Sequence, residues 1–191
     1  MSKKNRLPEI IIFAGPNGSG KTTITRMART IGVYINADDI KRSSLCSDLE
    51  AAVKAEELRE EMIEKSEDFT WNSAFYWLNI KLLKKAKEKG YFLRCIYVLT
   101  SDYKINIARV SMRESMGGHG VPEEKIKSRY YKALDLISEL VEICDIVHIY
   151  DNTNVPFRIF KKRKDIYFHW ENKYWSYSDI EKLTGISEYS N

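Results

Sequence analysis

Residues 10–24 read Ile-Ile-Ile-Phe-Ala-Gly-Pro-Asn-Gly-Ser-Gly-Lys-Thr-Thr-Ile, an apolar run followed by a glycine-rich stretch. Gly15 is followed by four residues and then by Gly20, Lys21 and Thr22, which is the pattern of a phosphate-binding P-loop. The two glycines let the main chain curl around an anion, and the N–H groups of the loop and of the next helix point at the phosphates. The sequence therefore predicts a nucleoside triphosphate site between a strand and a helix.

The residue types in this loop also predict the cofactors, which we expect to be ATP and Mg²⁺. A P-loop lysine reaches the β- and γ-phosphate oxygens, here Lys21, and the hydroxyl that follows it, here Thr22, binds the metal. ATP is favoured over GTP because the chain lacks the Asn-Lys-x-Asp motif that selects guanine. The expected nucleotide contacts are Gly15, Pro16, Asn17, Gly18, Ser19, Gly20, Lys21, Thr22 and Thr23, with Asp151 or Asn152 near the edge of the base.

The bulk properties suit a small enzyme that binds an anionic small molecule. The 191 residues are enough for one α/β domain, and the net charge of +4 comes from 31 basic and 27 acidic residues that are well mixed. Cys46, Cys95 and Cys144 lie far apart, which argues against a disulfide framework or a structural zinc site. Because no apolar run approaches the roughly 20 residues that span a bilayer, we expect a cytoplasmic protein without a membrane partner.

Strand and helix patterns alternate along most of the chain. This alternation predicts an α/β fold, a three-layer P-loop NTPase fold with a parallel central sheet and helices on both faces. The helix over 48–65 is expected to bury Leu49, Ala52, Ala55, Leu58 and Met62. Strands are predicted at 10–14, 32–35, 68–71, 91–99 and 146–150, and helices at 22–30, 48–65, 74–89 (capped by Ser73), 103–116 and 123–143.

The chain changes character after residue 152. An alternating segment over 157–170 predicts a β-hairpin, and a short helix is expected from Ser178, capped by Ser178 and Glu181. We therefore expect a single domain over 1–191, with a core at about 8–152 and a C-terminal extension at 153–191.

Two carboxylates follow the second predicted strand. Asp38 could accept the proton of an acceptor hydroxyl while Lys21 and Mg²⁺ hold the transferring phosphate. Asp39 is its rival, because adjacent residues at a strand end point in opposite directions. The alternative is that both are turn or capping carboxylates.

Several cations flank a glycine-rich loop at 117–122. Arg109 and Arg113 are four residues apart and share a helix face, so they are candidates to stabilise phosphate charge in the transition state. Arg129 is a third candidate, and His119 lies between glycines, where it could touch phosphate. For each arginine alone, a solvated helix position is the competing interpretation.

Taken in order and spacing, these motifs resemble the zeta toxin family of P-loop kinases over roughly residues 9–152. The resemblance implies transfer of the ATP γ-phosphoryl group to a hydroxyl of a nucleotide sugar, best known as the 3′-hydroxyl of UDP-N-acetylglucosamine, and restraint by a separate antitoxin protein. On this pattern Asp38 matches the catalytic base, Lys21 the phosphate lysine, Thr22 the Mg²⁺ ligand and Arg109 a lid arginine. Arg113, His119 or Arg129 could supply a second lid cation. The motifs are Ala14–Thr23, Asn36–Ile40, Arg109, Gly117–Pro122, Arg129–Tyr130 and Tyr150–Asn152.

One position departs from the family. Where the family commonly has a substrate-contacting glutamate after the third strand, this chain has Asn72. An amide can hydrogen-bond a sugar hydroxyl but cannot act as a base or attract Mg²⁺. The alternative function is therefore an ATP-binding regulatory or interaction module without transfer activity.

The predicted hairpin combines basic and aromatic residues. Such a combination is also found on RNA and single-strand binding surfaces. A hairpin with a solvated basic turn and a buried aromatic face is the favoured interpretation, so nucleic acid is not expected as a partner. The residues are the cluster 158–164 together with Phe157, Phe160, Tyr167, Phe168 and Trp170.

Overall fold

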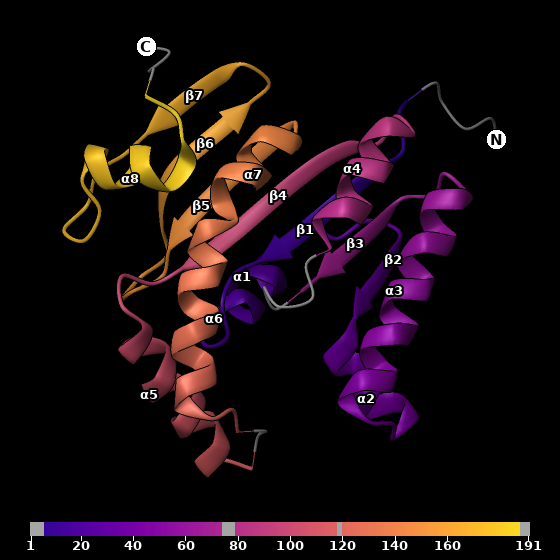
Figure 1. Cartoon of the computed structure of the whole chain (residues 1–191), viewed down its shortest axis with the longest axis horizontal. Helices are drawn as coiled ribbons and strands as arrows, with labels where there is room; N and C mark the ends of the chain where they lie inside the picture. Colours follow the sequence, from indigo (N-terminus) through magenta and orange to yellow (C-terminus); the bar gives the residue numbers. More distant parts are fainter. Residues whose placement is uncertain (1–5, 74–78, 118–119, 188–191) are drawn as a thin grey trace.

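The computed structural model describes residues 6–73, 79–117 and 120–187 (Figure 1). Strands and helices alternate through most of this part of the chain. In chain order the elements are β1 (Glu9–Ala14), α1 (Lys21–Met27), β2 (Val33–Asn36), α2 (Ala37–Ser44), α3 (Asp48–Glu64), β3 (Phe69–Asn72), α4 (Ile80–Glu88), β4 (Phe92–Leu99), α5 (Tyr103–Ser115), α6 (Glu123–Asp135), α7 (Ile137–Ile143), β5 (Ile146–Asp151), β6 (Phe157–Arg163), β7 (Ile166–His169) and α8 (Tyr177–Thr184).

The strands form one seven-stranded sheet in the order β2-β3-β1-β4-β5-β6-β7. The first five strands are parallel, and β6 and β7 are added antiparallel at one edge. Because parallel strands point the same way, the carboxyl ends of β1 to β5 meet at one edge of the sheet. The predicted α/β fold with a parallel central sheet and a C-terminal hairpin is confirmed.

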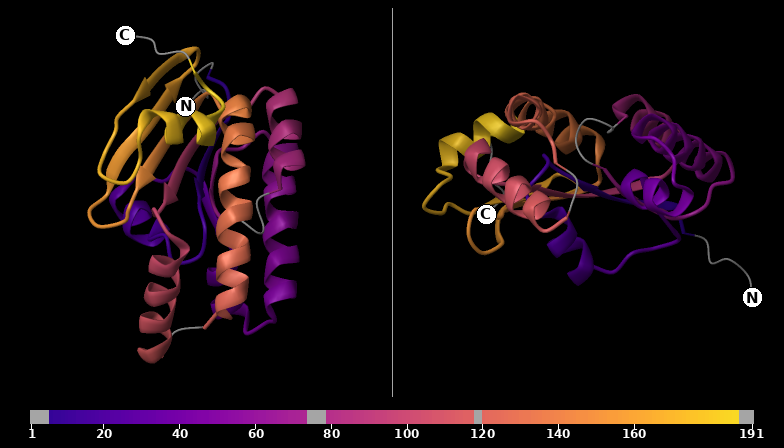
Figure 2. Two further views of the ribbon diagram at one scale, coloured as in Figure 1. Left: turned by 60° about the vertical axis from the view of Figure 1, so that its left-hand side comes forward. Right: turned by 90° about the horizontal axis from the view of Figure 1, so that it is seen from below.

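The two faces of the sheet are covered unequally (Figure 2). Helices α3, α4, α6, α7 and α8 lie over one face, where alternate strand residues such as Ile12 and Leu93 form the main apolar core. Helix α1 lies on the other face, and within the described ranges no helix covers that face over β5, β6 and β7. Helices therefore lie on both faces of the sheet, as expected, but their cover of the second face does not extend over the C-terminal strands in the described part of the chain.

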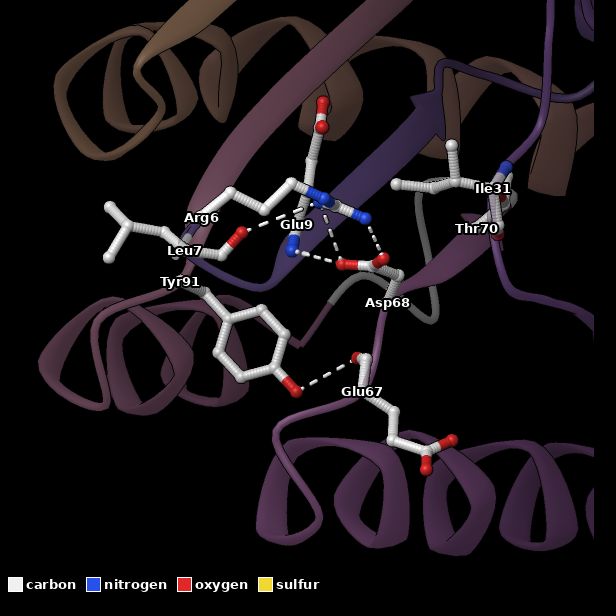
Figure 3. Close-up of polar contacts among 8 residues, drawn as sticks. All are labelled: Arg6, Leu7, Glu9, Ile31, Glu67, Asp68, Thr70 and Tyr91. Carbon is white, nitrogen blue, oxygen red and sulfur yellow. Dashed lines mark hydrogen bonds and ion pairs between the residues drawn. The ribbon is translucent and has the colours of Figure 1, made fainter. Parts of the chain in front are cut away.

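A polar cluster fixes the amino-terminal edge of the sheet (Figure 3). The Asp68 carboxylate accepts a 2.8 Å hydrogen bond from the main-chain N–H of Glu9 and forms an ion pair with Arg6. The Tyr91 hydroxyl donates to the main-chain oxygen of Glu67 at 2.9 Å. These contacts join β1, β3 and β4 at the edge opposite the P-loop, so the loop rests on a fixed set of strands.

Helix α2 was not predicted. Its Asn36 N-cap accepts a hydrogen bond from the Asp38 N–H at 3.1 Å, and both Asp38 and Asp39 lie in its first turn. Its only apolar residues are Ala37 and Ile40, which are partly buried against the core, and two positions are too few for a periodic pattern to indicate a helix. The two carboxylates are therefore at a helix N-terminus and not on a strand end.

Other predicted helix ends need smaller corrections. The predicted helix over 123–143 is divided into α6 and α7 at Leu136. Helix α8 begins at Tyr177, one residue before the predicted Ser178, and its capping box is formed by Ser176 and Asp179 in place of Ser178 and Glu181. The predicted start of the helix at 74–89 lies outside the described residues, and α4 is described from Ile80.

The C-terminal hairpin is tied to the rest of the sheet by buried polar contacts. The Lys162 ammonium donates to the main-chain oxygens of Val141 and Glu142 at the end of α7. The Asn172 amide donates to the buried Asp151 carboxylate at 2.7 Å.

Within the described residues, no helix is both long and apolar enough to cross a membrane.

Candidate active site around the P-loop

The P-loop connects β1 to α1 and packs tightly against its neighbours. Gly15 has φ +141°, and a Cβ there would lie 2.0 Å from the Val98 oxygen at the end of β4. Gly20 has φ +91°, and a Cβ there would lie 2.1 Å from the Asn152 side-chain nitrogen. Both positions require a positive φ that favours glycine, so the glycine spacing follows from the shape of the loop.

Lys21 is the first residue of α1 and turns back over the loop. Its ammonium donates to the main-chain oxygens of Gly15 at 2.7 Å and Pro16 at 3.0 Å. Burial lowers the pKa of Lys21 to about 8, while the Asp38 carboxylate raises it and the Arg113 guanidinium lowers it. Lys21 on α1 is thus close enough to Asp38 on α2 and to Arg113 on α5 for their charges to interact.

Two buried asparagine side chains donate hydrogen bonds to main-chain oxygens of the P-loop. The Asn106 amide on α5 donates to the Asn17 oxygen at 2.7 Å, and the Asn152 amide after β5 donates to the Ser19 oxygen at 2.8 Å. Asn152 was expected near the nucleotide base, but its amide nitrogen is bonded to the loop itself. Asn106 was missed by the sequence analysis, and its one signal is that asparagine is a poor residue for a helix interior.

Arg109 of α5 is anchored to the chain after β5. One terminal guanidinium nitrogen donates to the main-chain oxygens of Asn152 at 2.8 Å and Thr153 at 3.0 Å. The other terminal nitrogen lies beside Gly20 and is buried without a hydrogen-bond partner in the part of the chain that the structure describes. This nitrogen is a donor at the mouth of the P-loop.

The two candidate carboxylates have different surroundings. Asp39 forms an ion pair with Arg42 and accepts a 3.1 Å hydrogen bond from the Asn36 amide. Asp38 is exposed, and its charge acts on Lys21. Asp39 is therefore held by the side chains of Asn36 and Arg42, whereas the charge of Asp38 acts on the phosphate lysine.

Asn72 lies at the carboxyl end of β3, directly beside Asn36 of β2. It is buried, and its amide donates to the Tyr34 hydroxyl at 2.6 Å. Burial raises the pKa of Tyr34, and the nearby Asp39 and Asp38 carboxylates also raise it. Asn72 is thus linked through the Tyr34 hydroxyl to the polar residues at the start of α2, which include Asp38 and Asp39.

The remaining predicted site residues are placed as follows. Thr22 and Thr23 are exposed in the first turn of α1, whereas the Ser19 hydroxyl is buried without a hydrogen-bond partner among the described residues. Arg129 is partly buried on α6, and His119 lies outside the described residues.

The residues present fit a magnesium ion held mainly by a nucleotide. Across residues 6–73, 79–117 and 120–187 there is no group of three or more His, Cys, Asp or Glu that could hold a metal. Mg²⁺ is commonly bound through one or two protein oxygens together with substrate phosphates and water. The exposed Thr22 hydroxyl beside the P-loop could supply such an oxygen.

Comparison with known proteins identifies relatives of this fold. A chain from the molecular and structural characterization of the PezAT chromosomal toxin-antitoxin system of Streptococcus pneumoniae superposes with a TM-score of 0.60 at 17% identity, over 98% of this chain and 81% of that one. The crystal structure of AvrRxo1-ORF1:AvrRxo1-ORF2 with sulphate ions gives a TM-score of 0.66 at 16% identity, over 94% of this chain and 64% of that one. At these identities the likeness shows the fold alone.

Sequence comparison goes further. An uncharacterized protein of Haemophilus influenzae is 30% identical over 127 residues, which are 63% of this chain and 91% of that protein. The family model described as Zeta toxin matches residues 1–165, which is most of the chain. The family is consistent with ATP-dependent phosphotransfer. The expected resemblance is confirmed, and the chain belongs to the zeta toxin family.

Proposed function

We propose that this protein transfers the γ-phosphoryl group of ATP to a hydroxyl group of UDP-N-acetylglucosamine or a related nucleotide sugar. The observation that carries the proposal is that the Asp38 carboxylate lies near enough to the Lys21 ammonium for their charges to interact. The first lies on α2 and the second on α1, and the carboxylate is near enough to raise the pKa of the lysine. A carboxylate and an ammonium group thus lie near each other beyond the carboxyl ends of β1 and β2, which supports their proposed roles as base and phosphate-binding cation.

Asp38 is the proposed general base. It accepts the proton of the acceptor hydroxyl as that oxygen bonds to the γ-phosphorus, while the bond to the β-phosphate oxygen breaks and ADP leaves. Asp38 is suited to this role because it is exposed and not paired as Asp39 is. Mg²⁺-ATP supplies the phosphoryl group and the metal that neutralises part of its charge.

The cations of α1 and α5 are the proposed stabilisers of the transition state. Lys21 holds the phosphates over the P-loop, and its pKa of about 8 keeps most of it charged at neutral pH. Arg109 offers the buried guanidinium nitrogen beside Gly20 that has no hydrogen-bond partner among the described residues, and Arg113 adds positive charge near Lys21. Charge that builds up on the transferring phosphoryl oxygens is stabilised by donors that are already in place.

The acceptor is proposed to bind beside Asp38, at the ends of β2 and β3. Asn72, Asp39, Arg129 and His119 are the proposed acceptor contacts. Family membership supports a nucleotide sugar as acceptor, and Asn72 can still offer its amide oxygen to a hydroxyl. A protein antitoxin is a proposed partner, supported by the likeness to a chain of the PezAT toxin-antitoxin system.

Mass spectrometry of the acceptor tests this function. Purified protein is incubated with Mg²⁺-ATP and a panel of nucleotide sugars, together with nucleosides and free sugars as competing acceptors. The proposal expects one added phosphate on UDP-N-acetylglucosamine or a close relative, and no product with Lys21→Ala. Binding of ATP without phosphorylation of any acceptor in the panel would contradict it and favour the regulatory alternative.

A further inference from the structure

The hairpin distributes its aromatic rings between the two faces of the sheet. Phe160 is fully buried in the apolar core, and Tyr167 stacks against it. Phe168 and Trp170 alternate with them and point to the opposite face, where no helix of the described part lies over β5 to β7. The expected buried aromatic face is therefore correct for Phe160 and Tyr167, which are two of the five rings in the expected face.

The rings on this opposite face form a partly exposed platform. Phe168 and Trp170 lie nearly parallel, with ring centroids 5.9 Å apart and an angle of 14° between planes. On the neighbouring strand β5, His148 and Tyr150 have centroids 6.3 Å apart. We name the set His148, Tyr150, Arg158, Lys161, Phe168 and Trp170 the open sheet face.

Two cations, Arg158 and Lys161, lie against these rings. The Arg158 guanidinium is 4.7 Å from the Trp170 ring centroid, and the Lys161 ammonium is 5.3 Å from that of Phe168. Neither cation has an ion-pair partner in the described part of the chain. The Arg158 Nε is also buried without a hydrogen bond there.

A third cation borders the open sheet face on β4. Arg94 is paired with Glu9 at 2.9 Å. Burial lowers the pKa of His148 to about 4, and Arg158, Lys161 and Arg94 lower it further. The three cations therefore surround His148, and the face is positively charged with a neutral imidazole at neutral pH.

We infer that the open sheet face binds single-stranded nucleic acid. A single strand offers phosphates to Arg158 and Lys161 and free bases that stack on Phe168 and Trp170, so it uses both features of the face. An acidic polypeptide would use the cations alone. The bases of a duplex are already stacked on one another, so the rings favour a single strand. This inference is independent of the proposed kinase activity.

Fluorescence anisotropy with labelled 12-nucleotide oligouridine and oligothymidine tests the inference. Binding is measured between 50 and 300 mM salt for the unaltered chain, Arg158→Gln/Lys161→Gln and Trp170→Leu. The matched control is Lys81→Gln/Lys132→Gln, which removes two exposed lysines from α4 and α6 on the helix-covered side. Circular dichroism and ATP binding check that each variant is folded.

The expected results differ between the variants. Arg158→Gln/Lys161→Gln should weaken binding and lower the salt slope by about 1.4, because each single-strand phosphate contact contributes about 0.7. Trp170→Leu should weaken binding about fivefold or more with the salt slope unchanged, since it removes stacking and no charge. The control should bind as the unaltered chain does.

Four results would overturn the inference. The first is no binding at 50 mM salt, and the second is an equal loss in the α4/α6 control. The third is a combined result: unlabelled polyglutamate displaces the labelled oligonucleotide as well as unlabelled oligonucleotide does, and Trp170→Leu does not change the affinity. That result would assign the open sheet face to an acidic polypeptide. Loss of oligonucleotide binding in Lys21→Ala but not in Arg158→Gln/Lys161→Gln would place the strand at the P-loop and also count against it.

Discussion

The side-chain amide of Asn152 donates a 2.8 Å hydrogen bond to the main-chain oxygen of Ser19, and this bond joins the loop after β5 to the P-loop. The same residue's carbonyl accepts from Arg109 at 2.8 Å. Asn152 therefore stands between the phosphate-binding loop and an arginine of α5. The shape of the P-loop depends on a residue about 130 positions further along the chain.

Asn152→Ala should weaken ATP binding about three- to tenfold. The substitution leaves the buried Ser19 oxygen without its donor, at a cost of about 1–3 kcal/mol, of which part falls on the loop conformation that binds phosphate. Isothermal titration calorimetry with ATP measures the change. Asn154→Ala, which removes an exposed amide bonded to Tyr174, should leave ATP affinity unchanged. Equal affinities for all three proteins would show that the P-loop does not need this bond.

Arg109→Met should lower the turnover number by about a hundredfold or more. The substitution removes both the anchor to Asn152 and Thr153 and the donor beside Gly20, and an arginine that stabilises phosphoryl transfer is commonly worth 10³ or more. Lys104→Met changes an exposed cation on the same helix and should have little effect. A loss of thermal stability in Arg109→Met without any loss of turnover would mean that the arginine serves only the fold.

The stability of the protein should fall between pH 6.5 and pH 4, partly because of His148. The folded-state pKa of His148 is about 4, against an ordinary value of about 6.5, so only the unfolded chain takes up this proton as the pH falls through that window. Between pH 7 and pH 5 the free energy of unfolding should fall by about 1–2 kcal/mol more in the unaltered protein than in His148→Gln. Both proteins contain His169, so any contribution from that residue cancels in the comparison. Urea denaturation at the two pH values measures this difference. An equal pH dependence in both proteins would contradict the lowered pKa.

Local sequence rules were sufficient for the nucleotide half of the site. The spacing of Gly15, Gly20, Lys21 and Thr22 predicts a loop between a strand and a helix, and β1 and α1 stand on either side of it. That information is local because the loop needs its glycines for its own backbone angles. Asn106 could not be found in this way, since its role depends on how α5 packs behind the loop.

The buried face of α3 shows where an apolar pattern is not enough. Leu49 is 67% exposed although the pattern places it in the core, whereas Arg59 is 3% exposed and lies over the Trp71 ring at 4.3 Å. Alanines at 51, 52 and 55 leave the leucines free to face solvent, because small side chains let the helix pack closely on the sheet. Periodicity thus identified the helix and three of its expected buried residues, Ala52, Ala55 and Met62, but not the exposure of Leu49 and Leu58.

The hairpin shows a second limit of the same kind. Alternation in 157–170 predicted two strands, and β6 and β7 are there. Alternation assigns rings to two faces but does not say which face a helix will cover. Only the placement of α7 and α8 shows that Phe160 is buried while Phe168 faces the open side.

The most direct test of the proposed mechanism compares Asp38→Asn with Asp39→Asn. The rate of formation of phosphorylated nucleotide sugar is measured by mass spectrometry, and ATP affinity is measured by calorimetry on the same preparations. We predict that Asp38→Asn lowers the rate by about 10²–10⁴ with ATP still bound, as expected for loss of a general base, and that Asp39→Asn lowers it less than tenfold. A large loss of rate in Asp39→Asn with Asp38→Asn still active would contradict the assignment of Asp38 as the base.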